Sequence, residues 1–113
     1  MKERRVAANL VYINSKEFHK YHIVELFDNI VVNHYGLQEE LAMTEWLGGT
    51  ILLTHARDFD TEGVNSIEEF YAKADAWDDK TGSYYAYHIN RVLSPSAKFR
   101  TDDGSGNGNI QRL

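Results

Sequence analysis

Two apolar runs separated by a short polar turn dominate the first third of the chain. Tyr21 to Leu26 and Ile30 to Tyr35 are rich in β-branched and aromatic side chains, and they flank Phe27-Asp28-Asn29. Asp and Asn tolerate the left-handed backbone conformation that a tight turn requires. The pattern therefore predicts a β-hairpin over residues 21–36. Apolar side chains fall on both of its faces, so we expect the sheet to be covered on one side and partly covered on the other.

Further strands are predicted on both sides of this hairpin. Leu10 to Ile13 is a short apolar run typical of a first strand. Thr50 to Arg57 begins as a nearly continuous apolar run and then alternates, and we expect this strand to pair with the hairpin. The tyrosine-rich segment from Tyr84 to Leu93 predicts the last strand.

The sequence predicts one amphipathic helix, which begins at a capping box. Ser66 stands at the N-cap position and Glu69 three residues later, as in the Ser-x-x-Glu pattern that opens many helices. Four apolar side chains then recur at helical spacing: Ile67, Phe70, Ala74 and Trp77. This spacing predicts a helix that ends near Asp79 and lays one apolar stripe on the sheet.

The segment from Leu37 to Leu47 fits two structures. Residues 38–43 are good helix formers, whereas residues 44–47 fit the start of a strand that leads into a turn at Gly48-Gly49. We favour a short helix closed by Gly48, with a strand as the alternative.

These elements predict an α+β fold, a small and mainly antiparallel sheet packed by one main helix, with a possible second short helix. With 113 residues the chain is long enough for one core. We expect a single domain over residues 1–93. The polar, glycine-rich remainder, residues 94–113, predicts a flexible tail.

The composition excludes several classes of protein. The chain has no cysteine, which excludes disulfides and thiolate zinc sites. The basic start, Met1 to Arg5, is not followed by the apolar stretch of a signal peptide, and no apolar run approaches the length of a membrane span. We therefore expect a soluble, cytoplasmic protein that does not engage a membrane.

The net charge of −5 is unevenly distributed along the chain. Residues 17–79 hold 14 acidic side chains against three basic ones, which leaves −11, while residues 1–16 and 80–113 each carry +3. An acidic body disfavours broad binding to a phosphate backbone. A local basic patch formed by the two ends remains an alternative to a merely solvated surface.

A dense aromatic run near the C-terminus suggests a stacking or interface surface. Its tyrosines are Tyr84, Tyr85 and Tyr87. Arginines from the two ends could flank such a surface and suit single strands or ends of nucleic acid: Arg4, Arg5 and Arg100. The alternative is that alternate tyrosines face the core of the sheet.

The histidines invite a metal or acid–base interpretation. His19, His22 and His34 fall in or beside the hairpin, but no His-x-x-x-His spacing or cysteine supports a metal centre. His55 with Asp58 or Asp60 could form an acid–base pair, yet no nucleophile motif or phosphate-binding glycine loop accompanies it. We therefore expect no cofactor, no metal, no small-molecule substrate and no enzymatic activity.

Over residues 10–88 the element order resembles the WGR domain, a small β-sheet-plus-helix module of DNA-dependent poly(ADP-ribose) polymerases and of stand-alone bacterial proteins. Asn14-Ser15-Lys16 precedes the first hairpin strand, and Tyr35-Gly36-Leu37 takes the place of the Trp-Gly-Arg signature. Phe59 matches the phenylalanine that ends a third strand, and Asp79-Lys80-Thr81-Gly82 resembles the Lys-Thr-Gly helix exit.

The resemblance implies a binding module that engages nucleic acid or a nucleic-acid-processing protein. Tyr35, Gly36, the tyrosines at 84, 85 and 87 and the basic ends would form its contact surface. Leu37 replaces the family's DNA-engaging arginine, and an insertion of about residues 38–48 follows it. These departures affect inherited DNA-end binding more than they affect the fold.

A second hypothesis comes from a different class of protein. An acidic, cysteine-free single domain could be a protein inhibitor of mobile-element or phage type, such as an anti-CRISPR or anti-restriction factor. It would dock an acidic surface on a basic nucleic-acid-binding channel. The predicted helix supplies that surface: Glu68, Glu69, Asp75 and Asp78.

Overall fold

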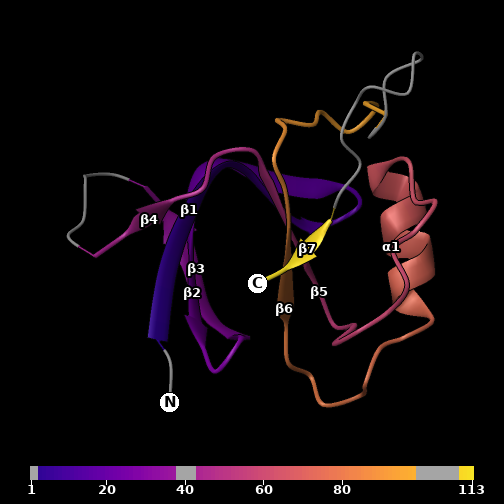
Figure 1. Ribbon diagram of the computed structural model, residues 1–113, viewed down its shortest axis with the longest axis horizontal. Helices are drawn as coiled ribbons and strands as arrows, with labels where there is room; N and C mark the ends of the chain where they lie inside the picture. Colours follow the sequence, from indigo (N-terminus) through magenta and orange to yellow (C-terminus); the bar gives the residue numbers. More distant parts are fainter. Residues whose placement is uncertain (1–2, 38–42, 99–109) are drawn as a thin grey trace.

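A long first strand, β1 (Glu3–Asn14), runs through the middle of the sheet and pairs along both of its edges. The computed structural model describes residues 3–37, 43–98 and 110–113 (Figure 1). On one edge β1 is antiparallel to β2 (Glu17–Phe27); on the other it is parallel to β4 (Glu45–Trp46) and β5 (Thr50–Thr54). The sequence predicted only residues 10–13 of β1, because charged Arg4 and Arg5 mask its beginning.

The predicted hairpin is confirmed. β2 turns into β3 (Ile30–Gly36) through Asp28 and Asn29, whose φ angles of 51° and 69° are both left-handed. Two consecutive left-handed residues give the turn type that matches the twist of paired strands. The register Phe27↔Ile30 closes the hairpin directly on this turn.

The remaining strands extend the sheet beyond β5. β6 (Tyr85–Ile89) is antiparallel to β5, and β7 (Gln111–Arg112) is antiparallel to β6, in the order β3-β2-β1-β5-β6-β7. The prediction that the Thr50 strand pairs with the hairpin is wrong, because β1 lies between them. The sheet curls until β3 and β6 meet, where the Val31 N–H donates to the Tyr84 carbonyl over 2.8 Å.

The helix α1 (Ile67–Asp75) begins at the predicted capping box. Ser66 Oγ accepts from the Glu69 N–H over 3.1 Å, and Glu69 Oε2 accepts from the Asn65 N–H over 2.8 Å. The helix ends at Asp75 and not near Asp79, because Asp78 already pairs with Ala56 in an isolated bridge.

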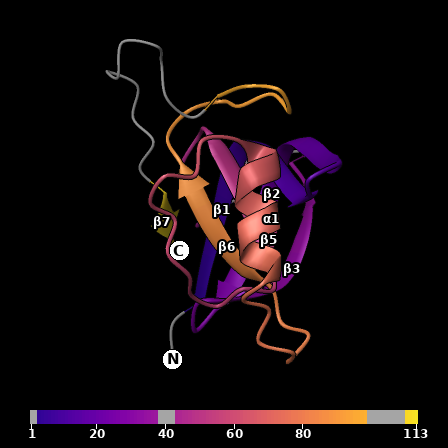
Figure 2. The same ribbon diagram turned by 90° about the vertical axis from the view of Figure 1, so that its right-hand side faces the viewer.

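α1 lies across one face of the sheet (Figure 2), and its apolar side chains belong to the core cluster on that face. Ile67, Phe70 and Ala74 are buried, as predicted, and Tyr71 joins them. Trp77 is 57% exposed and does not belong to the stripe, because it lies beyond the end of the helix.

Two apolar clusters form the core, one on each face of the sheet. The first lies under α1 and includes Tyr12, Leu52 and Phe70. The second fills the inside of the curl and includes Val24 and Ile51. Since β5 contributes Ile51 to one cluster and Leu52 to the other, both of its faces are buried, which explains its continuous apolar run.

The α+β class with a mainly antiparallel sheet and one helix is confirmed, but the second short helix is not present in the described residues. Glu45 and Trp46, which the favoured interpretation placed in that helix, form β4. Residues 38–42 lie outside the described residues, as do residues 99–109 of the predicted tail. The last four residues, assigned to the same tail, return to the sheet: the Leu113 N–H donates to the Ala86 carbonyl. No helix in the described parts of the chain has the length and apolar character needed to span a membrane.

Candidate binding site

A groove of about 400 Å³ lies where the start of β1 meets β2, β3 and the segment around β4. Its lining includes Arg4, Arg5, Glu25, Val32, Met43 and Glu45. We call it the β1–β4 groove. The Val32 and Met43 side chains are 60% and 91% exposed, so the groove offers apolar surface to the solvent beside charged groups.

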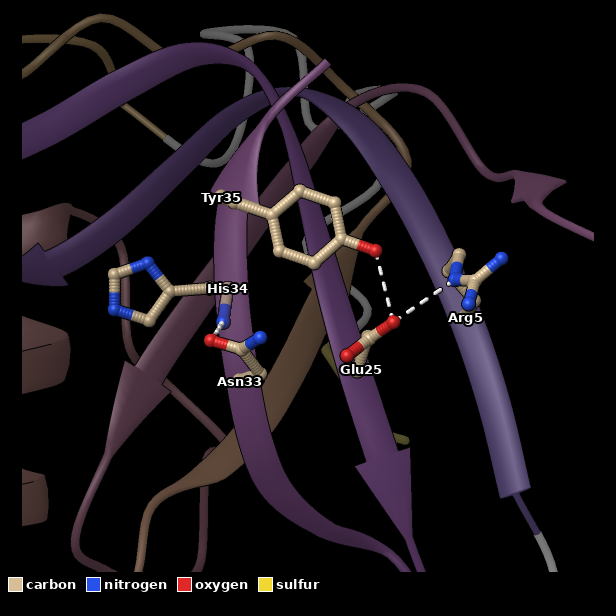
Figure 3. Close-up of polar contacts among 5 residues, drawn as sticks. All are labelled: Arg5, Glu25, Asn33, His34 and Tyr35. Carbon is tan, nitrogen blue, oxygen red and sulfur yellow. Dashed lines mark hydrogen bonds and ion pairs between the residues drawn. The ribbon is translucent and has the colours of Figure 1, made fainter. Parts of the chain in front are cut away.

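A hydrogen-bonded row of side chains crosses the three strands beside this groove (Figure 3). Glu25 Oε2 accepts from Arg5 Nε over 3.0 Å and from the Tyr35 hydroxyl over 2.8 Å. The hydrogen bond from Tyr35 is the main cause that lowers the pKa of Glu25, and Arg5 adds to it. Burial and the bond to Glu25 raise the pKa of Tyr35. The Tyr35 hydroxyl therefore uses its hydrogen for the bond to Glu25.

A second ion pair fastens β4 to β1. Arg4 Nη2 lies 3.1 Å from Glu45 Oε2. The backbone adds to this, since the Leu47 N–H donates to the Ala7 carbonyl over 2.9 Å. The sequence assigned both N-terminal arginines, Arg4 and Arg5, to nucleic-acid binding. In the structure each forms an ion pair with a carboxylate that lines the groove.

Two exposed aromatic side chains, Tyr21 of β2 and Trp46 of β4, lie close to each other but are not among the residues that line the groove. Glu45 lines the groove and Trp46 follows it in β4. The two rings are stacked, with 6.5 Å between their centroids. We call them the Tyr21–Trp46 pair.

Three histidines gather on β2 and β3. His22 Nε2 lies 2.9 Å from His34 Nδ1, and His19 stacks on His22 with 4.6 Å between ring centroids. Burial, with the neighbouring His19 and His34 adding to it, lowers the pKa of His22 to about 4. A nitrogen–nitrogen distance of this length is that of a hydrogen bond between the two rings. Among the described residues, no three His, Asp or Glu side chains are grouped so that they could hold a metal ion.

His55 joins the end of β5 to the segment before β6. Its Nδ1 lies 2.9 Å from the Ser83 carbonyl oxygen, and its ring centroid lies 4.1 Å from that of Tyr84. Asp60 Oδ1 instead accepts from the Glu62 N–H over 2.9 Å. The sequence offered His55 with Asp58 or Asp60 as a possible acid–base pair. Within the described chain, the structure shows no hydrogen bond between His55 and either aspartate.

The tyrosine run does not form one surface. Tyr85 and Tyr87 are 3% and 2% exposed. Their hydroxyls donate to Asp79 Oδ2 over 2.6 Å and to the Ala56 carbonyl over 2.8 Å. Tyr84 is half-buried. Alternate tyrosines thus face the core, the second of the two alternatives that the sequence offered.

The other predicted site residues are scattered. Gly36 ends β3 and is exposed, whereas Arg100 lies outside the described residues. The acidic set lies on and after α1, at the opposite end of the sheet from β4 (Figure 1). Its exposed members are Glu68, Glu69 and Asp75. Asp78 is half-buried, and its Oδ1 accepts from the Lys80 N–H over 2.7 Å.

Of the residues that the sequence assigned to a contact surface, the structure brings Arg5 and Tyr35 together on Glu25 and pairs Arg4 with Glu45. The sequence did not single out four exposed side chains of this region: Tyr21, Val32, Met43 and Trp46. One signal was present for Trp46. A strand at residues 44–47 was the alternative to a helix, and in so short a strand at the edge of a sheet a tryptophan has little to cover it.

Comparisons with known proteins found no protein that is significantly similar to this chain. No family model matches the chain, no curated protein is significantly similar to it, and no solved structure matches its fold. The WGR resemblance and the function it implies therefore stay predictions.

Proposed function

We propose that the chain is a non-enzymatic binding module that engages a protein partner through the β1–β4 groove. The observation that carries this proposal is the exposure of Val32 and Met43 in a groove rimmed by charged side chains. Protein interfaces combine an apolar or aromatic centre with a polar, charged rim. The resemblance to WGR domains suggests a nucleic-acid-processing protein as the partner.

The charges of this surface favour a protein over nucleic acid. Arg4 and Arg5 lie on Glu45 and Glu25, so their positive charges are largely offset at the surface. Glu3 also lines the groove. Neutralising phosphates is the main source of affinity for nucleic acid, and paired arginines supply little of it.

The test compares two valines of matched exposure. Val32 in the groove is 60% exposed, and Val92, which follows β6, is 59% exposed. We would capture partners from the native host with the wild-type chain and with Val32→Glu and Val92→Glu variants. A charge placed in an apolar interface centre is costly. Val32→Glu should therefore lose the specific partner, and Val92→Glu should keep it.

Each of the other outcomes counts against the proposal. If both variants keep the partner, the groove is not the contact surface. If short duplex or single-stranded nucleic acid binds the purified chain with steep salt dependence, the nucleic-acid form of the sequence hypothesis replaces the protein form.

One observation favours the inhibitor as a second candidate. Glu68 and Asp75 point out of α1 into solvent, on an acidic face away from the groove. Reversing both charges in a Glu68→Lys/Asp75→Lys variant leaves the capping contact of Glu69 in place. For an inhibitor that docks this face on a basic channel, the double variant should lose its target while Val32→Glu keeps it.

A further inference from the structure

Three histidine rings, those of His19, His22 and His34, gather where β2 meets β3, and we call them the histidine cluster. His19 and His22 lie three residues apart, a spacing that puts side chains on opposite faces of a regular strand. Their rings are nevertheless stacked, with 4.6 Å between centroids. Tyr21, which lies between them, has a left-handed φ angle of 49° that interrupts the alternation of faces. The fold thus keeps a strained residue, at a cost of about 1–2 kcal/mol, where it brings His19 onto His22.

The histidine cluster joins β2 to β3 through a contact that depends on protonation. His22 Nε2 lies 2.9 Å from His34 Nδ1, and the ring centroids of His19 and His34 are 6.4 Å apart. In a hydrogen bond between two imidazoles, one nitrogen carries the hydrogen and the other is free of it. When both rings are protonated, every ring nitrogen is a donor and the bond cannot form. Acid therefore replaces this attraction by repulsion between like charges.

The surroundings of His22 disfavour a positive charge on its ring. Burial, followed by the neighbouring His19 and His34, lowers the pKa of His22 to about 4. Among the described residues, no carboxylate contributes to this shift. Glu17 approaches His19 instead, with 3.6 Å between Oε2 and Nε2. The residues in register with His22 on the two flanking strands are uncharged: Ala8 of β1 and Gly36 of β3.

β3 is held on both sides at its start but on one side at its end. The Val31 N–H donates to the Tyr84 carbonyl on one side, whereas residues 33–36 pair with β2 alone within the described part of the chain. The Leu37 N–H closes this end by donating to the Tyr21 carbonyl over 2.8 Å. If this bond is released, Tyr21 can leave its left-handed conformation. The strain therefore favours separation of the end of β3 from β2.

Separation of this end would change the β1–β4 groove. Tyr35 follows His34 in β3, and its hydroxyl donates to Glu25, which lines the groove. Val32 of the same strand also lines it. When the end of β3 leaves β2, Glu25 loses the Tyr35 hydroxyl and the backbone that supports Val32 is no longer fixed. The groove then loses the arrangement that a partner would bind.

We propose that the histidine cluster is an acid-sensitive contact that holds the end of β3 on β2, and that its protonation lowers the affinity of the β1–β4 groove for a protein partner. The proposal rests on the protein-binding function proposed above and describes the regulation of that same site.

The direction of the effect follows from linkage. The pKa of His22 is lowered from 6.5 to about 4 when the strand end is closed, and it returns towards 6.5 when the strand end is open. The contribution of His22 to the closed state is therefore fully present above about pH 7 and is lost as the pH falls towards 4. After allowance for partial solvent access, the opening equilibrium should rise about tenfold between pH 7.5 and pH 5.

Hydrogen exchange of the Leu37 amide tests this opening without a partner. After correction for the intrinsic pH dependence of exchange, its protection should fall about tenfold between pH 7.5 and pH 5. Low concentrations of urea should leave the exchange rate nearly unchanged, because a local opening exposes little surface. Equal protection at both pH values would overturn the proposal. So would a urea dependence as steep as that of global unfolding, because acid would then act on the whole fold.

Three variants assign the effect to the histidine cluster. His22→Leu should abolish the pH dependence of Leu37 protection, because it removes the buried titrating ring. His34→Gln, at an exposed position, should reduce the dependence and provides the test if His22→Leu does not fold. His88→Gln should preserve it, because His88 Nε2 instead lies 3.0 Å from the Gly48 carbonyl oxygen of another part of the sheet. A dependence that survives unchanged in the first two variants would overturn the proposal.

The protein that the wild-type chain captures from its host tests the regulation of the groove. Since only the closed chain binds, its Kd for the wild type should rise about twofold or more between pH 7.5 and pH 5. For folded His22→Leu the Kd should stay constant; if that variant does not fold, His34→Gln should show a smaller rise than the wild type. An equal rise in the folded variant, or no rise in the wild type, would overturn the proposal. Failure of the proposed function is distinguishable, because Val32→Glu would then keep the partner at pH 7.5.

Discussion

The hydroxyl of Tyr35 donates a hydrogen bond of 2.8 Å to the same Glu25 oxygen that accepts from Arg5. Three neighbouring strands are thereby joined by one carboxylate. Tyr35, which the resemblance to WGR domains predicts as a contact residue, thus links β3 to β2 and β1 through its hydroxyl. It also places the Arg5 guanidinium against Glu25 at the wall of the groove.

Tyr35→Phe should raise the pKa of Glu25, because it removes the main cause that lowers it. Stability near neutral pH should fall by about 1 kcal/mol, the typical net value of one hydrogen bond. Carboxyl NMR titration and urea unfolding measure the two effects. Tyr21→Phe, which removes an exposed hydroxyl, is the control, and an unmoved Glu25 titration in Tyr35→Phe would contradict this account.

His22 should make the fold sensitive to mild acid. Its pKa is lowered from 6.5 to about 4 in the folded chain, so between these values the unfolded chain binds the extra proton. The contribution of His22 to the free energy of unfolding should therefore be fully present above about pH 7. It should fall by about 2 kcal/mol as the pH approaches 4, after allowance for partial solvent access.

The measurement is urea unfolding at several pH values between about 5 and 7, where ordinary carboxylates titrate little. His22→Leu should flatten the dependence, and His88→Gln should preserve it. A slope that survives in His22→Leu would assign the acid sensitivity to another group.

Tyr85→Phe should raise the pKa of Asp79 from about 2 towards its ordinary value. The hydrogen bond from the Tyr85 hydroxyl is the largest cause of that lowering, and Thr81 supplies the next contributions. Thr81→Val should raise it too, because Thr81 Oγ1 also donates to this carboxylate. Asp79 contributes stability above about pH 4 that is lost as the pH falls towards 2. NMR titration of the Asp79 carboxyl checks both variants, and an unchanged value in Tyr85→Phe contradicts the assignment.

Gly49→Ala should be far more damaging than Gly63→Ala. Both glycines have left-handed φ angles, 65° and 83°, so alanine at either should cost about 1–2 kcal/mol. At Gly49 an added Cβ would also collide with the Ile89 carbonyl and lie 2.9 Å from the Arg91 backbone nitrogen, whereas at Gly63 it would meet nothing within 4 Å. Thermal unfolding compares them, and similar losses at both sites would show that β5 and β6 are not so closely packed there.

The parts of the fold that the sequence predicted are those in which neighbours along the chain decide the structure. Asp28 and Asn29 encode the hairpin turn by themselves, and Ser66 with Glu69 encodes the start of α1. The misplaced end of α1 has a non-local cause. Asp78 pairs with Ala56, which lies more than twenty residues earlier, and this bridge draws Trp77 out of the helix.

The site was only partly predictable for the same reason. The partners of Arg4 and Arg5 are Glu45 and Glu25, which come from other strands of the sheet. Arg5 meets Glu25 through the antiparallel register of β1 and β2, whereas Arg4 meets Glu45 only because β1 pairs in parallel with β4, and no local pattern indicates a parallel register. The basic start of the chain could therefore be noticed from the sequence, but its neutralisation could not.

The most direct test of the central claim is a hydrogen-exchange footprint of the chain with and without its captured partner. The account predicts that protection gathers at the start of β1, at β3 around Val32 and at β4, while α1 exchanges as in the unbound chain. Protection confined to α1 around Glu68 and Asp75, with β4 unchanged, would contradict it and favour the inhibitor.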